Sequence, residues 1–259
     1  MKNHISATII TFNEQNRVEA CIDSLAGVAD EIIVVDAGSS DATVEICRRR
    51  GCRVVTRRMH GYGAQRQFAT SLATHSYVLA IDADECLSPA LSAEIIRLKE
   101  AGFKHRGYCF PRLNFFCGEP VRHSGWYPDV QVRLFDKRYA NWNLREVAER
   151  VIFHDQVRPC RLSGDLLHYR CDTIEEYVAT QRRHAALSGQ RLAEQNKGSR
   201  LPHPLLAATK ACLKNYIADG AFMDGPQGRA IARETFKSTY LAHQIARRLI
   251  DLKKADSSK

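Results

Sequence analysis

Two carboxylates stand at the end of an apolar run, in the segment Leu79-Ala80-Ile81-Asp82-Ala83-Asp84-Glu85. Side chains two residues apart point to the same side of an extended chain, so we expect Asp82 and Asp84 to face the same way. Neighbouring carboxylates repel each other unless a cation lies between them. Mg²⁺ and Mn²⁺ prefer oxygen ligands and commonly link carboxylates to phosphate oxygens. The spacing therefore indicates a metal site suited to a nucleoside diphosphate; a solvated acidic turn before a helix at Ser88-Pro89 is the alternative.

A second acidic position follows another apolar run. Asp36 ends the segment Glu31-Ile32-Ile33-Val34-Val35-Asp36, and a Gly-Ser-Ser-Asp turn comes directly after it. A carboxylate at such a strand end can accept hydrogen bonds from a base or a ribose. Ser40 or Asp41 can instead cap the helix that follows, a role that leaves Asp36 available for binding.

Strand and helix patterns alternate up to residue 82. The apolar, β-branched runs that predict strands are 5–12, 31–36, 52–56 and 77–82, and helical spacing predicts helices at 17–25, 42–50 and 64–74. This alternation with short connections is typical of an open α/β sheet, in which ligands bind beyond the carboxyl ends of the strands. The polar residues at or after these ends, predicted to share that edge, are Thr11, Asn13, Asp36, Asp82 and Asp84.

Several classes of protein lack their sequence signals here. No Gly-x-Gly-x-x-Gly follows the first predicted strand, which disfavours a dinucleotide-binding fold, and no P-loop motif occurs. The nine cysteines are scattered without a Cys-x-x-Cys pair, so neither a zinc site nor a disulfide framework is expected. No apolar run approaches about 18 residues, and the N-terminus has no signal-peptide pattern. We therefore expect a cytoplasmic protein without a membrane-spanning helix.

The pattern changes along the second half of the chain. Short strand-like pieces at 108–110, 130–135 and 149–153 predict a mixed extension of the sheet. Three helices are predicted after them, at 174–195, 205–221 and 228–254.

The net charge of +9 lies in the last third of the chain. Residues 1–181 hold 23 Lys and Arg against 23 Asp and Glu, whereas residues 182–259 hold 15 against 6, an excess of nine. In the predicted helix 229–254, apolar residues recur at helical spacing and basic residues fill other positions. A basic amphipathic helix indicates binding to an anionic membrane surface; a helix packed on the body with a solvated charged face is the alternative.

Three segments carry a resemblance to a known family: 6–14, 30–43 and 81–85. They resemble the fingerprints of inverting family 2 glycosyltransferases with the GT-A fold. Further motifs resemble those of the bacterial lipopolysaccharide inner-core glucosyltransferases that extend the first heptose. These motifs are Gly61-Tyr62-Gly63-Ala64-Gln65, Trp126-Tyr127-Pro128-Asp129, Arg133-Leu134-Phe135, Leu167-His168-Tyr169, and Phe222-Met223-Asp224-Gly225 with Gly228. The resemblance covers nearly the whole chain.

The resemblance implies which residues bind the nucleotide. Thr11, Asn13 and Glu14 would line the nucleotide pocket, Asp36 would bind the uracil or the ribose, and Asp82 would contact the nucleotide. These roles all fall on the predicted ligand edge of the sheet.

The resemblance also implies a cation and its contacts. Asp84 would hold Mg²⁺ or Mn²⁺ on the donor diphosphate, and Gln65 or Arg66 would reach the nucleotide or the donor phosphates. His168 would be a further metal ligand or a phosphate donor; a structural role beside Tyr169 is its alternative.

An inverting transfer needs a base that deprotonates the acceptor hydroxyl. We predict Asp129 as this base, because it lies in a Pro-Asp turn before a strand and because the resemblance implies a carboxylate near this point; Glu149 is the second candidate. The alternative for Asp129 is an ion pair with Arg133. Close relatives commonly carry Val-His-Glu where this chain has Val147-Ala148-Glu149, so Ala148 stands in place of their histidine.

Together these observations predict an α/β protein with the GT-A fold, an open and mostly parallel sheet flanked by helices, with a C-terminal helical extension. Residues 1–170 would form the nucleotide-sugar-binding catalytic domain, and 171–259 a basic helical domain at the membrane surface or the acceptor. The expected activity moves a hexose, glucose above all, from a UDP-sugar to the heptose region of the lipopolysaccharide inner core. The expected partners are a lipid-linked heptose acceptor and an anionic membrane surface, with the protein peripheral on the cytoplasmic face of the inner membrane.

Three other classes of protein were weighed against this prediction. A polyprenyl-phosphate or other cell-envelope sugar transferase is the nearest alternative. A nucleotidyltransferase is more distant, because the first predicted strand is followed by Thr11-Phe12-Asn13-Glu14 in place of a Gly-rich basic loop. Nucleic-acid binding through the basic tail is not expected, because no recognised nucleic-acid motif occurs.

Overall fold

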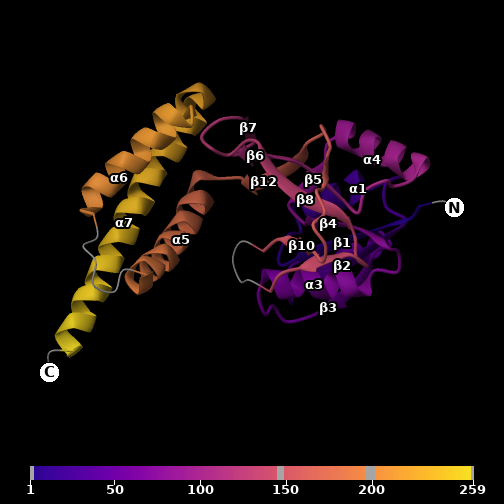
Figure 1. Ribbon diagram of the computed structural model, residues 1–259, viewed down its shortest axis with the longest axis horizontal. Coiled ribbons are helices and arrows are strands. Elements are labelled where there is room, and N and C mark those ends of the chain that lie inside the picture. The colour runs from indigo at the N-terminus through magenta and orange to yellow at the C-terminus, as the bar shows by residue number, and fades with distance from the viewer. Residues whose placement is uncertain (1–2, 145–148, 196–201, 258–259) are drawn as a thin grey trace. The chain divides into compact units, whose positions relative to one another are not determined.

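The computed structural model describes residues 3–144, 149–195 and 202–257. The chain forms two compact units. Unit 1 consists of Met1–Leu113 and Asp129–His168, and unit 2 of Asn114–Pro128 and Tyr169–Lys259. Figure 1 shows the elements of each. The fold is the predicted mixed α/β class, with a mostly parallel sheet, flanking helices and a long C-terminal helix, as in the GT-A fold.

Four parallel strands form the predicted half of the sheet in unit 1. They are β1 (Ile5–Thr11), β2 (Glu31–Asp36), β3 (Arg53–Thr56) and β4 (Tyr77–Asp82), in the order β3-β2-β1-β4. All seven residues of β1 are buried, as expected for a parallel strand covered on both faces. The register pairs Thr11 with Asp36 and Ile10 with Asp82. The predicted meeting of these strand ends at one edge is therefore confirmed.

Short helices connect these strands. They are α1 (Val18–Ser24), α2 (Thr43–Arg49) and α3 (Tyr62–Leu72), and a fourth helix, α4 (Pro89–Ala101), follows later in the chain. The predicted helix start at Ser88 is confirmed, because its side chain accepts a hydrogen bond from the Leu91 N–H at 3.2 Å and Pro89 occupies the first helical turn. Ala69 of α3 is buried in one cluster with Ile10 and Val35, so α3 covers one face of the parallel strands.

The sheet continues with antiparallel strands, as predicted for its mixed extension. They include β5 (Glu85–Leu87), β6 (Gly107–Phe116), β8 (Asp129–Asp136) and β12 (Leu166–Cys171), and the sheet order runs from β4 through β8, β6 and β12 to β5. β7 (Glu119–Val121) and β11 (Cys160–Arg161) pair with β6, and β9 (Ala140–Trp142) pairs separately with β10 (Val151–Phe153). β6 is longer than the predicted strand 108–110 because its polar residues pair with other strands of the sheet.

Unit 2 is built around three helices: α5 (Ile174–Gln195), α6 (Pro204–Leu213) and α7 (Gly225–Ser257). A π-helical turn at Lys214–Ala218 and a 3₁₀ turn at Ala221–Asp224 join α6 to α7, so the predicted helix 205–221 is interrupted. α5 and α6 both pack on α7. Small residues bring α5 and α7 close together, since a Cβ placed on Gly189 would lie 2.8 Å from the Ala242 carbonyl oxygen.

Residues 114–128 also belong to unit 2. Hydrogen bonds to the Asp224 carboxylate join this segment to the 3₁₀ turn before α7. The carboxylate accepts from the N–H groups of Arg122 and His123, at 3.1 Å each, and from the Ser124 hydroxyl at 2.7 Å. The units therefore group residues differently from the predicted division at residue 170, and the role predicted for 171–259 stays a prediction. Within the described part of the chain, no helix combines the length and apolarity needed to span a bilayer.

Candidate active site

Asp82 lies at the end of β4, and the chain turns directly after it. The extended geometry assumed for Asp82 and Asp84 therefore ends at Asp82. Arg66 Nη2 donates to Asp82 Oδ2 at 2.7 Å, and Arg133 Nη2 lies 3.5 Å from the same oxygen. Although burial opposes ionisation, these two guanidinium groups hold the pKa of Asp82 well below its usual range. Asp82 is thus an ionised carboxylate with cationic partners from the protein itself.

Asp84 is next to His168, a residue 84 positions later in the sequence. The antiparallel pairing of β5 with β12 sets His168 opposite Glu85, and His168 Nε2 lies 3.2 Å from Asp84 Oδ2. Both side chains remain partly exposed. The two residues predicted as metal ligands are therefore brought together.

The donor set around Asp84 fits a cation that is shared with phosphate. Among the described residues, no group of three or more His, Cys, Asp or Glu side chains could hold a metal ion. Asp84 and His168 would supply two ligands, and diphosphate oxygens and water would complete the coordination, as is usual for Mg²⁺. Burial, together with the nearby charge of Asp84, raises the pKa of Glu14 to about 7. A cation at Asp84 would reduce this repulsion, so the local charge also fits one.

The ends of β1 and β2 form the second part of the predicted site. The Thr11 side chain is buried, and its hydroxyl has no hydrogen-bond partner within the described part of the chain. Asp36 is 1% exposed and its carboxylate accepts hydrogen bonds from the N–H groups of Gly38 and Ser39, at 2.9 Å each. Asp36 therefore fixes the turn after β2, and its predicted contact with a base or ribose stays a prediction.

Asn13 ties the turn after β1 to the turn after β2. Its backbone φ is 56°, in the left-handed region that asparagine tolerates. Its side-chain oxygen accepts a hydrogen bond from the Ser40 N–H at 2.8 Å, and its own N–H donates to the Ser39 hydroxyl at 2.8 Å. The Glu14 N–H donates to the Thr43 hydroxyl at 2.8 Å. The residues predicted to line the nucleotide pocket thus form one hydrogen-bonded edge.

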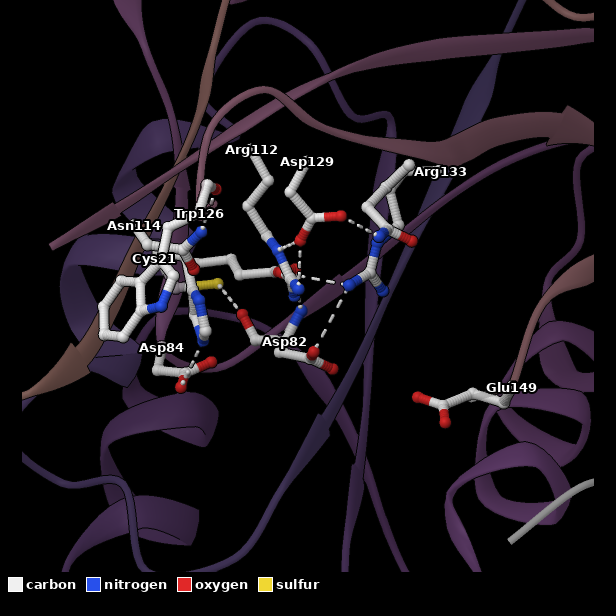
Figure 2. Close-up of polar contacts among 12 residues, drawn as sticks. Cys21, Asp82, Asp84, Arg112, Asn114, Trp126, Asp129, Arg133 and Glu149 are labelled. Carbon is white, nitrogen blue, oxygen red and sulfur yellow. Dashed lines mark hydrogen bonds and ion pairs between the residues drawn. The ribbon is translucent and has the colours of Figure 1, made fainter. Parts of the chain in front are cut away.

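Glu85 is the central residue of the site that sequence reasoning missed. Its side chain is fully buried. One carboxylate oxygen accepts from Arg112 Nη1 at 3.1 Å and from Arg133 Nη2 at 2.9 Å, and the other accepts from the Asp82 N–H at 2.9 Å. Figure 2 shows the side chains of Arg112 and Arg133 above Asp82, the residue whose N–H donates to Glu85. A buried carboxylate with two guanidinium partners fixes the position of both arginines.

Asp129 is joined to this network through Arg112. Arg112 Nε and Nη2 donate to Asp129 Oδ2 at 2.9 and 2.6 Å, and Gln131 Nε2 donates to Oδ1 at 2.5 Å (Figure 2). The alternative interpretation paired Asp129 with Arg133. The partner is Arg112, because the β6–β8 register sets Arg112 opposite Asp129. The Asp129 side chain stays 30% exposed.

Glu149, the second candidate base, is joined to the network through Arg66. Arg66 Nε lies 3.3 Å from Glu149 Oε1, and the Arg66 guanidinium stacks over the Trp142 ring at 4.9 Å. Both candidate bases are thus linked to Asp82 or Glu85 by an arginine. We name the alternating residues Asp129, Arg112, Glu85, Arg133, Asp82, Arg66 and Glu149 the charge network.

Gln65 lies apart from these groups. It is 1% exposed, and its side-chain nitrogen donates to the Arg57 carbonyl oxygen at 3.1 Å. Arg66 is also buried and paired, so the predicted contacts of Gln65 or Arg66 with a nucleotide stay predictions. Ala148 lies outside the described residues. The available sequence signal for the missed arginines was a basic residue inside an apolar strand, at Arg112 and Arg133.

The sheet, its flanking helices and the carboxylates at its edge are consistent with the GT-A class of nucleotide-sugar-dependent enzymes. The model of the family "Glycosyl transferase family 2" matches residues 6–148. That match covers more than half of the chain, so this protein belongs to glycosyl transferase family 2.

Known relatives include proteins from two groups of bacteria. An uncharacterized glycosyltransferase of Rickettsia conorii is 50% identical over 202 residues, which cover 74% of this chain and 72% of the relative. The lipopolysaccharide core biosynthesis glycosyltransferase LpsC of Rhizobium meliloti is 26% identical over 257 residues, which cover 94% of each chain. The expected membership of a glycosyltransferase family with a lipopolysaccharide-core homologue is therefore confirmed.

Among solved structures, glucosyl-3-phosphoglycerate synthase from Mycobacterium tuberculosis, in complex with Mn²⁺, uridine diphosphate and glucosyl-3-phosphoglycerate, is similar with a TM-score of 0.35 and 23% identity. The alignment covers 44% of this chain and 44% of that chain. Staphylococcus aureus TarS aligns with a TM-score of 0.45 and 14% identity, over 96% of this chain and 55% of that one.

Proposed function

We propose that this family 2 enzyme is an inverting glycosyltransferase that moves a hexose, with glucose as first candidate, from a UDP-sugar to the heptose region of the lipopolysaccharide inner core. The observation that carries the proposal is the pair Asp84 and His168, at 3.2 Å, beside the strand-end edge of Thr11 and Asp36. The name of the homologue LpsC supports a lipopolysaccharide-core acceptor. A cation held by two protein ligands keeps coordination positions for diphosphate oxygens.

The donor half of the site would bind the nucleotide at the ends of β1 and β2. The unpartnered Thr11 hydroxyl, the exposed Asn13 and the partly buried Glu14 would contact the nucleoside. Asp36 would contribute to nucleotide binding by fixing the turn after β2 through its hydrogen bonds with Gly38 and Ser39. Asp84 and His168 would hold Mg²⁺ or Mn²⁺ at the diphosphate. When bound there, a divalent cation offsets the negative charge that develops on the leaving diphosphate.

Asp129 would take the proton from the acceptor hydroxyl. Its Oδ2 is fixed by two hydrogen bonds from Arg112, which is itself anchored on the buried Glu85. This arrangement holds the carboxylate in one orientation while 30% of its side chain stays exposed to an incoming acceptor. Glu149 is the second candidate, because it is partly exposed and Arg66 holds it in the same charge network.

The two candidate bases are separated by Asp129→Asn and Glu149→Gln. Because loss of a general base costs on the order of 10²–10⁴-fold in rate, we expect Asp129→Asn to lower kcat by at least about 100-fold, and Glu149→Gln by less than about tenfold. Product analysis by NMR should show an inverted anomeric centre in the wild type. If neither variant loses more than about tenfold, Asp129 is not the base; the reverse order of losses assigns the role to Glu149.

The nucleotide preference tests the donor half independently of the acceptor. A panel of nucleoside diphosphates, each with and without Mn²⁺, is expected to raise the melting temperature most for UDP with metal, since a ligand that binds only the folded state stabilises it. Equal stabilisation by all nucleotides, or by none, would contradict a UDP-sugar donor.

The proposed acceptor determines where the enzyme works. A heptose region carried on a lipid is at a membrane, so we place the enzyme peripherally on the cytoplasmic face of the inner membrane, where it would meet an anionic lipid surface. The excess of nine positive charges in residues 182–259 supports such a surface.

A further inference from the structure

The basic helix α7 buries part of its apolar stripe against the other helices of unit 2. Ile231, Ala242 and Ala246 of α7 are buried. Ala246 lies in one cluster with Ala193 of α5, and α6 packs on α7 as well (Figure 1). The buried part of this stripe holds unit 2 together, and among the described residues most large exposed apolar side chains of unit 2 lie outside α7.

Large apolar side chains are exposed on α6 and on the turns that follow it. We name them the α6 surface; its residues are Leu205, Leu206, Leu213, Ile217, Phe222 and Met223, each more than half exposed. By contrast, the smaller Ala208 of α6 is fully buried. A helix that buries alanine and exposes leucine has its apolar stripe on the solvent side, which marks an interaction site.

Cationic side chains border the α6 surface. Leu206, Leu213 and Ile217 line an open hollow of about 560 Å³ together with Lys210 and Lys214. A second hollow, of about 530 Å³, shares Leu213 and is bordered by the cations Arg229, Arg233 and Lys237. The acidic groups that face these cations are Asp219, which pairs with Lys214, and Glu234, which pairs with Arg233 and Lys237.

We infer that the α6 surface docks unit 2 onto an anionic phospholipid bilayer, with the leucine and isoleucine side chains in the acyl boundary and the bordering cations at the lipid phosphates. Apolar residues that protrude beside Lys and Arg are the combination by which interfacial helices bind. A second copy of this chain is a poor occupant, because each border has five cations and two acidic groups, and two such net positive borders repel each other. The inference rests on the proposed function, in that a lipid-linked acceptor gives the enzyme a reason to bind a bilayer.

The expected losses of vesicle binding follow from two contributions, the attraction of basic side chains to lipid phosphates and the insertion of apolar side chains. Each Lys or Arg near an anionic surface contributes about fivefold to the binding constant. Leu206 and Ile217 are 69% and 64% exposed, so changing both to serine removes most of two inserted side chains, and we expect at least about a tenfold loss of binding. Both side chains are exposed in the free protein, so the fold should tolerate the change.

The experiment measures binding of the full chain to sedimented vesicles, either phosphatidylcholine alone or phosphatidylcholine with one quarter phosphatidylglycerol. The test variant is Leu206→Ser with Ile217→Ser. The matched control is Leu187→Ser with Leu252→Ser, which removes two other exposed side chains, on α5 and α7, outside the α6 surface. A charge variant, Lys210→Gln with Arg229→Gln, is matched by Arg58→Gln with Lys104→Gln, which changes the net charge equally in unit 1.

We expect the wild type to prefer anionic vesicles, the Leu206/Ile217 variant to bind at least about tenfold more weakly, and the matched control to bind within about twofold of the wild type. The Lys210/Arg229 variant should lose more than its own control. The inference is overturned if the Leu206/Ile217 variant binds like the wild type, or if neutral vesicles bind equally well. It is also overturned if light scattering finds a wild-type dimer that this variant converts to a monomer.

The inference and the proposed function can fail separately. Stabilisation by UDP with Mn²⁺ requires no lipid, and vesicle binding requires no donor. Vesicle binding through the α6 surface without any UDP effect would refute the proposed function and leave the docking surface. A UDP effect with vesicle binding that ignores the α6 surface would refute the inference and leave the enzyme.

Discussion

Replacing the buried Glu85 carboxylate with an amide, in Glu85→Gln, is expected to destabilise unit 1 strongly. Glu85 is fully buried, and one of its oxygens receives hydrogen bonds from both Arg112 and Arg133. Arg133 is 4% exposed, so water cannot replace the lost charge at its guanidinium. The amide of glutamine also presents an NH₂ group where a carboxylate oxygen accepted a hydrogen bond. This NH₂ group would then face an N–H donor of Arg112, Arg133 or the Asp82 backbone, with which it cannot form a hydrogen bond.

The size of the destabilisation by Glu85→Gln follows from the burial of Glu85 and Arg133. Removing one partner of a buried ion pair costs about 3–5 kcal/mol, because the remaining charge stays buried without compensation. For a domain of this size about 1 kcal/mol corresponds to roughly 2–4 °C, so the melting temperature should fall by roughly 6–20 °C.

Urea unfolding can report unit 1 alone. The chain has two tryptophans, Trp126 in unit 2 and Trp142 in unit 1, so a Trp126→Phe background leaves Trp142 as the probe. The matched control is Glu19→Gln, since Glu19 also lies within 4 Å of two arginines but on the surface, with 48% of its side chain exposed. Surface pairs contribute about 0–1 kcal/mol. If Glu85→Gln costs no more than Glu19→Gln, the charge network does not stabilise the site as argued.

Two further predictions concern stability in unit 2 and at the start of the sheet. Gly189→Ala should lower the free energy of unfolding by about 1–3 kcal/mol, because its Cβ would lie 2.8 Å from the Ala242 carbonyl oxygen. Ser188→Ala is the control, because Ser188 is exposed on α5, and it should cause no such loss. Equal melting temperatures for the two variants would contradict the close α5–α7 packing. Burial would raise the pKa of Asp30, but hydrogen bonds from Lys99, the Ile5 N–H and His4 lower it to about 2. Because its pKa in unfolded chains is about 3.9, Asp30 should stabilise the fold above that pH and lose this contribution as the pH falls through about 2. The difference in unfolding free energy between wild type and Asp30→Asn should therefore shrink between pH 7 and pH 2.5, and a constant difference would refute this.

The parallel half of the sheet was predictable because its signals are local. Apolar runs such as 31–36 and 77–82 are strands covered on both faces, and a polar residue that ends such a run must lie at the sheet edge. The register then needed no further information, since parallel neighbours connected by short helices end together. Thr11, Asp36 and Asp82 were therefore placed correctly relative to one another.

The antiparallel half depends on pairings between distant residues. The approach of His168 to Asp84 follows from the register of β12 on β5, which joins residues about eighty positions apart. The motif around His168 suggested a metal role only by resemblance. Nothing local to either residue fixes their distance.

The burial of Arg133, and the partial burial of Arg112, were missed for a related reason. An arginine in a strand is ordinarily expected at the surface, and only a buried carboxylate such as Glu85 makes an interior position tolerable. In the sequence, Glu85 only follows Asp82 and Asp84, and nothing local marks it as buried. Its burial comes from β5, a three-residue strand too short to be recognised in the sequence.

In unit 2, the sequence pattern likewise shows an apolar stripe but not what covers it. Periodicity in α7 correctly indicated a helix with one apolar face, but it does not say whether lipid or protein covers that face. Three small residues of α5 let it approach α7 closely, so that protein covers part of this face: Ala185, Gly189 and Ala193. The exposed leucines of α6 look like core residues in the sequence and lie at the surface in the fold.

The central claim is that Asp84 and His168 make UDP binding depend on a divalent cation. Calorimetric titration of UDP into wild type and Asp84→Ala, with Mn²⁺ and with chelator, tests it most directly. We expect chelator to weaken UDP binding to the wild type by at least about tenfold, or about 1.4 kcal/mol, and Asp84→Ala to bind UDP weakly with or without metal. Unchanged UDP affinity in chelator, together with glycoside formation by Asp84→Ala, would contradict the account.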